Sequence, residues 1–334
     1  MSTIIKFYVF TSSMITIIIP VHNGETTLPL LLASLLRQNN KELAEEIIFI
    51  LDGANPASTA LVENFLQNDN YKSRIIVHQA PAGLASCYNE GIAAASTAFF
   101  LFMHQDIVLN SNDVFSSLLA PFDGNPDVVV TYPRYLLPVA TWEAFSFWQK
   151  CFFSRQAGRV IPSYSGKCDC YRKELLLSKV GGFDEETYRT AGEDGDIARR
   201  IAATGLKTVN VPLELTHLHS RNPDFSFKDL FYKECQYGEA HGANLRKHGA
   251  GAITGFLMTY FRPLLVLGLF LPVVRMPSAV LVAFYSVAYT WRVYLYGIRT
   301  MNWRTFLLPA ANVFLLFAGA ACTALGFMTK RQRL

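Results

Sequence analysis

The stretch FFLFMHQDIVLN, residues 99–110, joins an uninterrupted apolar run to a short polar cluster. The first five residues are all apolar, and His104, Gln105 and Asp106 follow before the chain turns apolar again. A run of this kind is typical of a strand that is buried on both faces of a sheet. Its polar end has two interpretations: a strand tip that reaches water, or a cation or phosphate site at the edge of the sheet.

Three other segments repeat the pattern of an apolar strand, and helical patterns separate them. Leucines at helical spacing follow the strand at residues 15–21, and a helix of small residues precedes the strand at residues 98–106. Strands that alternate with helices roughly every 25 residues predict an open, mostly parallel α/β sheet. The expected strands are 15–21 (ITIIIPV), 46–53 (EIIFILDG), 74–79 (RIIVHQ) and 98–106, with helices over 25–38 and 83–96. A further strand is expected at 127–133.

Polar residues stand at the carboxyl ends of three of these strands. His22 and Asn23 follow the first strand, Asp52 ends the second, and the cluster at residues 104–106 ends the fourth. Ligands of open parallel sheets bind outside the carboxyl ends of the strands, so these side chains are expected at one site. Plain turns would also account for the Asn-Gly and Asp-Gly pairs.

Charge and hydropathy divide the chain in two. Glu239 is the last acidic residue, and ten of the 30 Lys and Arg residues follow it. The part up to Glu239 therefore has a net charge of −6, and the tail has a net charge of +10. An acid-free, basic and apolar tail suits a membrane with anionic headgroups. Its basic residues are spaced along apolar runs rather than clustered, which argues against nucleic-acid binding.

Three apolar segments make up the tail, at residues 253–274, 278–297 and 305–328. Each approaches or reaches the roughly 20 residues that span a bilayer. Arg262 and Pro263 interrupt the first segment, which predicts an interfacial or re-entrant helix there. Two spans would then keep the basic C-terminal end on the cytoplasmic side, as the positive-inside rule favours, whereas three would place it outside. Buried helices of a soluble domain are the alternative.

Two amphipathic stretches precede the tail. Residues 142–153 (WEAFSFWQKCFF) place aromatic side chains on one helical face, which fits a membrane interface or a packed core equally well. Residues 225–248 form the second amphipathic stretch, which ends on basic residues. The six cysteines show no disulfide or zinc-finger spacing, so we expect reduced thiols facing the cytosol, with Cys168 and Cys170 in structural roles. The apolar run near Lys6 is too short for a signal-peptide core, so nothing suggests export.

Five motifs in order resemble the family 2 glycosyltransferases of the GT-A fold, over residues 15 to about 220. They are ITIIIPVHNGETTLPLLLASLLRQ, EIIFILDGA, PAGLASCYNEGIAAAS, FLFMHQDIVL and VGGFDEETYRTAGEDGDIARRIAATGLKT. FLFMHQDIVL lies where that family has an Asp-X-Asp metal motif, and His104 replaces the first Asp. The resemblance implies a donor site for a nucleoside diphosphate sugar, in which Asp52 binds the base. The donor-binding residues it implies are Pro20, His22, Asn23, Asp52, Gly83, Asn89, His104 and Gln105.

The resemblance also implies a metal and a base. A divalent cation, Mn²⁺ or Mg²⁺, would neutralise the diphosphate leaving group, and carboxylate oxygens are its preferred ligands. Asp106 is the first predicted ligand, with His219 slightly preferred to His217 as a further one. Asp194 is expected to be the general base of an inverting transfer, supported by Glu193. Asp196 is expected to pair with Arg200 one helical turn on.

The sequence therefore predicts a membrane-anchored glycosyltransferase that transfers a hexosyl or deoxyhexosyl group. The acceptor is expected to be a lipid-linked saccharide or a polyprenyl phosphate, because a soluble acceptor would not need the apolar tail. The alternatives are a nucleotide-sugar-binding membrane scaffold and a nucleotidyltransferase, although the first loop lacks the basic residues of the latter. No Gly-X-Gly-X-X-Gly follows the first strand, which excludes a short-chain dehydrogenase. The expected divisions are 1–14 (extension), 15–222 (GT-A domain with a cytoplasmic face), 223–250 (juxtamembrane segment) and 251–334 (inner- or plasma-membrane region).

Overall fold

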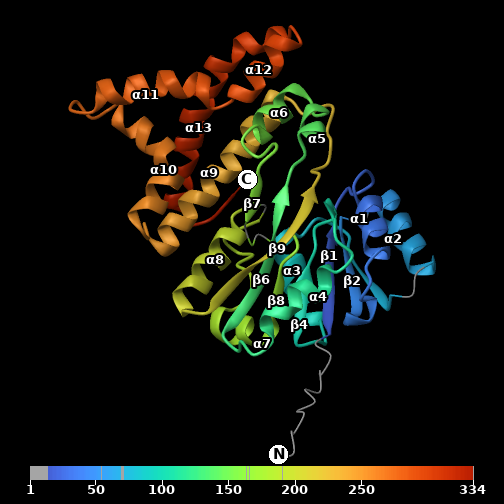
Figure 1. Cartoon of the computed structure of the whole chain (residues 1–334). Helices are drawn as coiled ribbons and strands as arrows, with labels where there is room; N and C mark the ends of the chain where they lie inside the picture. Colours follow the sequence, from blue (N-terminus) through green and yellow to red (C-terminus); the bar gives the residue numbers. More distant parts are fainter. Residues whose placement is uncertain are drawn as a thin grey trace, which may run out of the picture.

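A nine-stranded mixed sheet forms the centre of the molecule in the computed structural model (Figure 1). The structure describes residues 14–53, 55–68, 71–162, 164, 166–189 and 191–333, so nearly all of the predicted extension 1–14 lies outside the described residues. The strand order is β3-β2-β1-β4-β8-β6-β9-β5, with β7 beside β6. The strands are β1 (Ile15–Val21), β2 (Ala44–Asp52), β3 (Ser73–His78), β4 (Phe99–Phe102), β5 (Ile107–Val108), β6 (Val128–Leu136), β7 (Val160–Pro162), β8 (Cys170–Arg172) and β9 (Lys207–His217).

The first four long strands form the parallel part of this sheet. β1 lies between β2 and β4 and pairs with both in parallel, and β2 pairs in parallel with β3. Every residue of β1 is buried, as expected of a strand covered on both faces. The predicted α/β architecture is confirmed. Beyond β4 the sheet is mixed, because β8 runs antiparallel to both β4 and β6, whereas β9 is parallel to β6.

Helices cover both faces of the sheet, and the alternation of side chains along β1 shows how. Ile17 and Ile19 enter one apolar cluster, and Ile18 enters the other, because successive strand residues point to opposite faces. The first cluster holds residues of α1 (Leu28–Leu36), α2 (Pro56–Asn68) and α4 (Val114–Leu119). The second holds residues of α3 (Leu84–Ala94) and α8 (Glu193–Thr204). Short helical turns lie at η1 (Lys41–Leu43), η2 (Ala120–Phe122), α7 (Lys173–Leu175), η3 (Leu176–Val180) and η4 (Trp303–Leu307).

The aromatic stretch at residues 142–153 lies in the interior, between the sheet and the tail. It forms the end of α5 (Val139–Glu143) and all of α6 (Phe147–Phe153), because Ser146 begins a new helix and accepts a hydrogen bond from the Gln149 N–H. Core packing is therefore the correct alternative for these aromatic residues. Their cluster combines Trp142, Phe145, Phe147 and Phe153 with Leu230, Val293, Leu308 and Leu315 from later helices.

The second amphipathic stretch forms α9 (Phe227–His248), as predicted, and a capping box of Ser226 and Asp229 starts it. α9 packs along α13 (Leu308–Thr329) with the two backbones in contact. A Cβ on Gly242 would lie 2.0 Å from the Thr323 carbonyl oxygen, and one on Gly326 would lie 2.0 Å from the Glu239 carbonyl oxygen. Only glycine allows this approach, so the tail and α9 form one packed unit.

The tail contains three more helices, α10 (Ile253–Gly268), α11 (Arg275–Ala288) and α12 (Trp291–Arg299). The expected apolar segment 278–297 is therefore not one helix, since the chain turns near Tyr289 and Thr290. Among the described residues, one helix, residues 303–329, is long and apolar enough to cross a membrane, and 44% of its most apolar window is buried inside the molecule. α11 and α12 lie far from the parallel strands (Figure 1), and most exposed large apolar side chains belong to this tail.

After α13 the chain returns to the sheet domain, a contact that the sequence pattern does not predict. Gln332 is buried, and its backbone N–H donates to the Thr187 carbonyl oxygen at 2.8 Å. Its side-chain oxygen accepts from the backbone N–H groups of Arg189 (3.0 Å) and Ala191 (3.3 Å). The C-terminal segment therefore holds the loop that leads into α8.

Candidate active site

A cavity of about 320 Å³ lies at the carboxyl ends of β1, β2 and β4, where the sequence predicted the donor site. Six of the eight predicted donor-binding residues line it, together with Asp106 and Arg189. Asn23 and Asn89 do not line it. The predicted residues in the lining are Pro20, His22, Asp52, Gly83, His104 and Gln105.

Gln105 joins two of these strand ends. Its side-chain oxygen accepts from the His22 backbone N–H at 2.9 Å, and its amide donates to the His22 carbonyl oxygen at 2.7 Å. The His22 ring in turn donates from Nδ1 to the Asp52 carbonyl oxygen at 2.6 Å. A Cβ on Gly24 would lie 2.6 Å from the Gln105 side-chain oxygen, so glycine is needed beside it. Gln105 thus positions the loop that borders the cavity.

The carboxylate of Asp52 holds the loop on the other side of the cavity. It accepts hydrogen bonds from the backbone N–H groups of Ala82 (2.7 Å) and Gly83 (3.1 Å) and from His78 Nδ1 (2.9 Å). Burial acts to raise the pKa of Asp52, but these hydrogen bonds outweigh it and the pKa is lowered. Asp52 is therefore ionised at neutral pH, and its predicted contact with the base of a nucleotide stays a prediction.

The two predicted asparagines have neighbours outside the cavity. Asn89 donates to the Phe183 carbonyl oxygen at 2.9 Å and accepts from the Phe183 N–H at 2.8 Å, so it fastens the GGFDE segment to α3. Asn23 has a φ of 51° and donates to His22 Nε2 at 3.1 Å. Their role in donor binding stays a prediction.

Two groups of side chains have the spacing of a metal site among the described residues, and the first is a hydrogen-bonded network. It consists of Asp52, His78 and Cys87. His78 donates from both ring nitrogens, to Asp52 and to Glu90. Burial raises the pKa of the Cys87 thiol to about 12, so the thiol carries its proton within this network.

The second group, His104, Asp106 and His217, fits a metal. One ligand atom from each of the three lies within 4.8 Å of the others. His217 Nε2 lies 3.2 Å from Asp106 Oδ2. His219, with a φ of 54°, places Nδ1 4.0 Å from the same oxygen, outside the group of three. The structure thus brings both predicted histidines to Asp106 and places His217 nearer, whereas the sequence reasoning slightly preferred His219.

The electrostatics of this group favour a bound cation. Burial acts to raise the pKa of Asp106, but His217, His104 and His219 hold it well below its usual range. Burial lowers the pKa of His104 to about 3 and, together with His217, lowers the pKa of His219, so both rings are neutral and able to donate a lone pair. Asp106 Oδ1 and His219 Nε2 are buried and have no hydrogen-bond partner in the part of the chain that the structure describes. Mn²⁺ accepts both carboxylate and imidazole ligands, so these residues fit it.

Tyr88 sets the proton position on His104. Its hydroxyl donates to the Gly166 carbonyl oxygen at 2.8 Å and lies 2.7 Å from His104 Nε2. A hydroxyl has one proton, so His104 Nε2 must donate to Tyr88, and Nδ1 carries the lone pair. Nδ1 faces Asp106 Oδ1 at 4.0 Å. His104, predicted as a donor-binding residue, is thus also oriented as a metal ligand would be.

The predicted base lies in a second cavity, of about 390 Å³, on the other side of the histidines. Asp194 lines this cavity together with His217, His219 and Lys167. It stands in the first turn of α8 and accepts from the Gly195 N–H at 2.7 Å. Gly192 precedes the helix with a φ of 98°, which favours glycine.

The two neighbours of Asp194 in the acidic cluster are buried. Burial and the charge of Asp194 raise the pKa of Glu193 to about 7. Asp196 accepts from Arg200 at 2.8 Å, as predicted, and also pairs with Lys247 and His248 at 2.7 Å each. Asp196 therefore fastens α8 to α9, and Asp194 is the member of the cluster that faces the cavity.

Sequence reasoning missed the basic residues of the two cavities. Arg189 lines the first, and Lys167 and Lys233 line the second. Each is a single cation in a segment of mixed composition, so no spacing or pattern marks it. The position of Arg189 between the GGFDE and EDGD segments was the one available signal.

Matches to known sequences place this chain in a family. The model described as glycosyl transferase family 2 matches residues 16–176, and the model described as glycosyl transferase family group 2 matches residues 127–323. The second match covers more than half of the chain, which therefore belongs to the family 2 glycosyltransferases.

Individual relatives and structures agree with this family. A "Pre-mycofactocin glycosyltransferase" of Mycobacterium tuberculosis is 26% identical over 65% of this chain and 46% of its own length. The "Uncharacterized glycosyltransferase EpsJ" of Bacillus subtilis is 34% identical over 29% of this chain and 27% of its own. The chain thus spans less than half the length of these relatives.

Two solved structures share the fold. "Mannosyltransferase PcManGT from Pyrobaculum calidifontis in complex with GDP-Man and Mn2+" superposes with a TM-score of 0.54 at 16% identity, over 93% of this chain and 86% of its own. GalNAc-T7 "with UDP, GalNAc and Mn2+" gives a TM-score of 0.51 at 15% identity, over 74% of this chain and 53% of its own. The fold is therefore GT-A-like.

Proposed function

We propose that this protein transfers a hexosyl or deoxyhexosyl group, with inversion, from a nucleoside diphosphate sugar to a lipid-linked saccharide or polyprenyl phosphate. The observation that supports it is the meeting of two cavities at one cluster of ligands. The cavity beside β1 and β2 reaches Asp106, and the cavity that holds Asp194 reaches His217, 3.2 Å away. A donor on one side and an acceptor on the other would react across this cluster.

The first cavity would bind the donor. Asp52 and Gly83 border the end away from the cluster, where the nucleoside would lie, and Gln105 and Arg189 border the remainder. The cation of Arg189 suits the negative charge of a diphosphate. Asp106 and His217, with His104 and His219 beside them, would hold Mn²⁺ or Mg²⁺, which supplies Lewis-acid stabilisation of the leaving diphosphate. The Mn²⁺ in the two similar solved structures supports this assignment.

Asp194 would accept the proton of an acceptor hydroxyl, because it is the carboxylate that lines the second cavity beside the histidines. Glu193 lies behind it and is protonated in part at neutral pH. A neutral Glu193 would leave Asp194 as the unpaired carboxylate of this turn among the described residues, since Asp196 is paired with Arg200, Lys247 and His248.

The tail supports a membrane location for the acceptor. We propose residues 15–222 as the catalytic domain facing the cytoplasm, 223–250 as the juxtamembrane segment and 251–334 as the region that contacts the inner or plasma membrane. The six cysteines are free in the structure, which suits a reducing compartment. The acid-free tail carries the exposed apolar side chains that a bilayer would cover.

The test is hydrolysis of a panel of nucleotide sugars by the purified full chain in detergent, with Mn²⁺, with Mg²⁺ and with chelator. We expect metal-dependent release of one nucleoside diphosphate, lost in Asp106→Ala and strongly reduced in Asp194→Asn. Asp123→Ala and Asp224→Asn, two exposed carboxylates outside both cavities, are the matched controls and should keep the activity. If the wild-type chain releases no nucleoside diphosphate and shows no metal-dependent nucleotide binding, the proposed donor site is refuted. If Asp194→Asn keeps the wild-type rate, the role of Asp194 as the base is refuted.

A further inference from the structure

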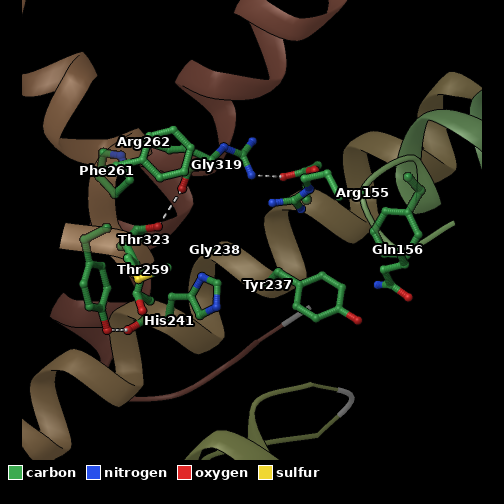
Figure 2. A pocket seen from close by; sticks show the side chains of 15 residues that line it. Arg155, Gln156, Tyr237, Gly238, His241, Thr259, Phe261, Arg262, Gly319 and Thr323 are labelled. Atoms are coloured by element: carbon green, nitrogen blue, oxygen red, sulfur yellow. Dashed lines mark hydrogen bonds and ion pairs between the residues drawn. The ribbon is translucent and has the colours of Figure 1, made fainter. Parts of the chain in front are cut away.

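A third cavity lies next to the one that holds Asp194, on the side of the tail helices. It has a volume of about 320 Å³ and lies between the end of α6 and helices α9, α10 and α13. Phe152, Gln156 and Tyr237 line both cavities, so the two cavities lie side by side. Figure 2 shows Arg155, Gln156 and Tyr237 on one side of this outer cavity and Thr259, Arg262 and His241 on the other.

The outer cavity contains one paired and one unpaired arginine. Arg262 donates to Glu234 Oε2 at 2.7 Å, so its charge is neutralised within the protein. Arg155 has no ion pair among the described residues. Its guanidinium lies over the ring of Tyr289, 4.8 Å from the centroid, which orients it without cancelling its charge.

The inner cavity contains a second unpaired cation, Lys233 on α9. Among the described residues it has neither a hydrogen-bond acceptor nor a carboxylate partner, although it is half-buried. Other partly buried cations of this region are paired: Arg200 and Lys247 with Asp196, and Arg262 with Glu234. A cation removed from water without a partner costs free energy, and a bound anion would offset that cost.

Apolar residues of α10 also line the outer cavity. Met258, Phe261 and Pro263 of α10 line the outer cavity, and the side chain of Met258 is 80% exposed. α10 belongs to the acid-free tail, so no carboxylate beyond Glu239 repels an anion here. A ligand that spans both cavities would carry an anionic group between Lys233 of the inner cavity and Arg155 of the outer one, and an apolar chain along α10.

We propose that the two adjacent cavities together form the acceptor site and that Lys233 and Arg155 bind the phosphate of a single-chain lipid phosphate. This inference rests on the proposed function, since Asp194 in the inner cavity marks the end of the acceptor site where transfer would take place. It adds what that proposal leaves open: the acceptor carries its phosphate within reach of α9 and α6, and its lipid chain lies against α10 and not against the sheet domain.

The test measures binding of farnesyl phosphate to the full chain in detergent, with farnesol and inorganic phosphate as separate arms. Arg155→Gln and Lys233→Gln should each weaken farnesyl phosphate binding by about tenfold or more, the loss expected when one partner of a charge pair is removed. Arg159→Gln and Lys228→Gln are the matched controls, because both are exposed cations outside the two cavities and near the test residues. They should bind farnesyl phosphate as the wild type does.

Each other outcome would overturn the proposal. Equal binding of farnesol and farnesyl phosphate, unchanged in both test variants, would show a merely apolar surface. Inorganic phosphate bound as tightly as farnesyl phosphate would show a site for free phosphate and not for a lipid.

Binding of UDP and GDP with Mn²⁺ separates this proposal from the proposed function. Neither Arg155 nor Lys233 lines the donor cavity, so both variants should bind the nucleotide normally, which also shows that they are folded. Normal nucleotide binding without farnesyl phosphate binding would overturn the acceptor site alone. Absence of nucleotide binding in the wild type would overturn the proposed function itself.

Discussion

At His104, the position of one ring proton decides whether the side chain can bind a metal. The Tyr88 oxygen accepts a hydrogen bond from the His104 Nε2–H, because its own hydroxyl proton is donated to the Gly166 carbonyl oxygen. A partner behind a ligating histidine commonly changes metal affinity by about 10- to 100-fold. His104 would therefore serve as a ligand to a metal bound beside Asp106 only while Tyr88 holds its ring in this tautomer.

The first prediction tests this dependence. Tyr88→Phe should lower the affinity for Mn²⁺ by about tenfold, because the His104 ring loses the acceptor that fixes its tautomer. Electron paramagnetic resonance of free Mn²⁺ in a titration measures the affinity. Tyr164→Phe is the matched control, since its hydroxyl donates to the Ala198 carbonyl oxygen, away from the three ligands. Equal Mn²⁺ affinity in Tyr88→Phe and wild type would contradict the assignment.

The second prediction concerns Glu193, whose pKa burial and Asp194 raise from 4.5 to about 7. Between these pH values the folded chain keeps a proton that the unfolded chain has released. The free energy of unfolding therefore falls as pH rises through this window, by up to about 1.4 kcal/mol for each pKa unit. Glu193→Gln has no such proton to lose, so its melting temperature should decline less with pH and should exceed that of the wild type at about pH 8.

Thermal melts from about pH 5 to pH 8 check this expectation. Glu63→Gln, a change at an exposed glutamate of α2, is the control and should follow the wild-type curve. If the melting temperatures of Glu193→Gln and wild type change with pH in the same way, Glu193 titrates as an exposed carboxyl does.

These residues also show what a sequence can and cannot predict at this scale. Asp106 and Asp194 were predictable as candidates because each stands in an ordered series of motifs, and both lie at the meeting point of the two cavities. The proton on His104 depends on Tyr88 and Gly166, which only the folded chain brings together. Lys233 and Arg155 carry no local pattern, because their lack of a partner is a property of the tertiary structure.

At the scale of elements, periodicity predicted the parallel strands well, because a strand buried on both faces must be continuously apolar. β8 escaped prediction, since three residues between β4 and β6 carry too little pattern. The division of α11 from α12 also escaped, because the apolar character continues across Tyr289 and Thr290 while the helix does not. The composition of the sequence was thus enough to predict where the tail begins. Its packing against α9 could be seen only in the structure.

The element that most directly joins tail and active site is the segment after α13. Gln332 holds Arg189 and Ala191, which lie between the donor cavity and the start of α8. The third prediction is that Gln332→Ala raises the donor KM and lowers kcat, because this loop loses buried hydrogen bonds worth about 1 kcal/mol each. The melting temperature should fall by only about 2–4 °C per kcal/mol.

Steady-state kinetics and thermal melts measure both effects. Arg331→Ala removes an exposed side chain one residue earlier and should change neither. A loss of stability in Gln332→Ala with unchanged kcat and KM would show that the contact serves stability alone and does not position the loop.

At the scale of the whole molecule, the same contact restricts how the chain can meet a membrane. Gln332 touches the loop before α8, so the C-terminal segment and the sheet domain lie on the same side of any bilayer that this chain binds. A single crossing by α13 would separate them. α13 also packs along α9 with backbone contact at Gly242, which leaves only part of its surface for lipid. These contacts favour a tail that enters the bilayer from one side or crosses it an even number of times.

The exposed side chains of the tail indicate which part would enter. Trp303 and Phe306 are 65% and 88% exposed, and both lie in the turn between α12 and α13. Arg304 stands between them, with its guanidinium 5.9 Å from the Trp303 ring centroid. An aromatic side chain beside a cation suits the headgroup level of a bilayer, where the ring meets the acyl chains and the cation meets phosphate.

The fourth prediction is that the full chain floats with lipid vesicles and prefers anionic ones, because the tail has ten cations and no acidic residue. Phe306→Asp should reduce flotation about tenfold or more, since it places a charge where an apolar ring would enter the bilayer. Leu30→Asp is the matched control, because Leu30 is 49% exposed on α1, in the sheet domain, and should float as the wild type does. Equal flotation of Phe306→Asp and wild type would place the bilayer contact elsewhere on the tail. Release of the wild-type chain by high salt alone would mean that the apolar surface stays outside the acyl region and that the ten cations alone hold the chain to the membrane.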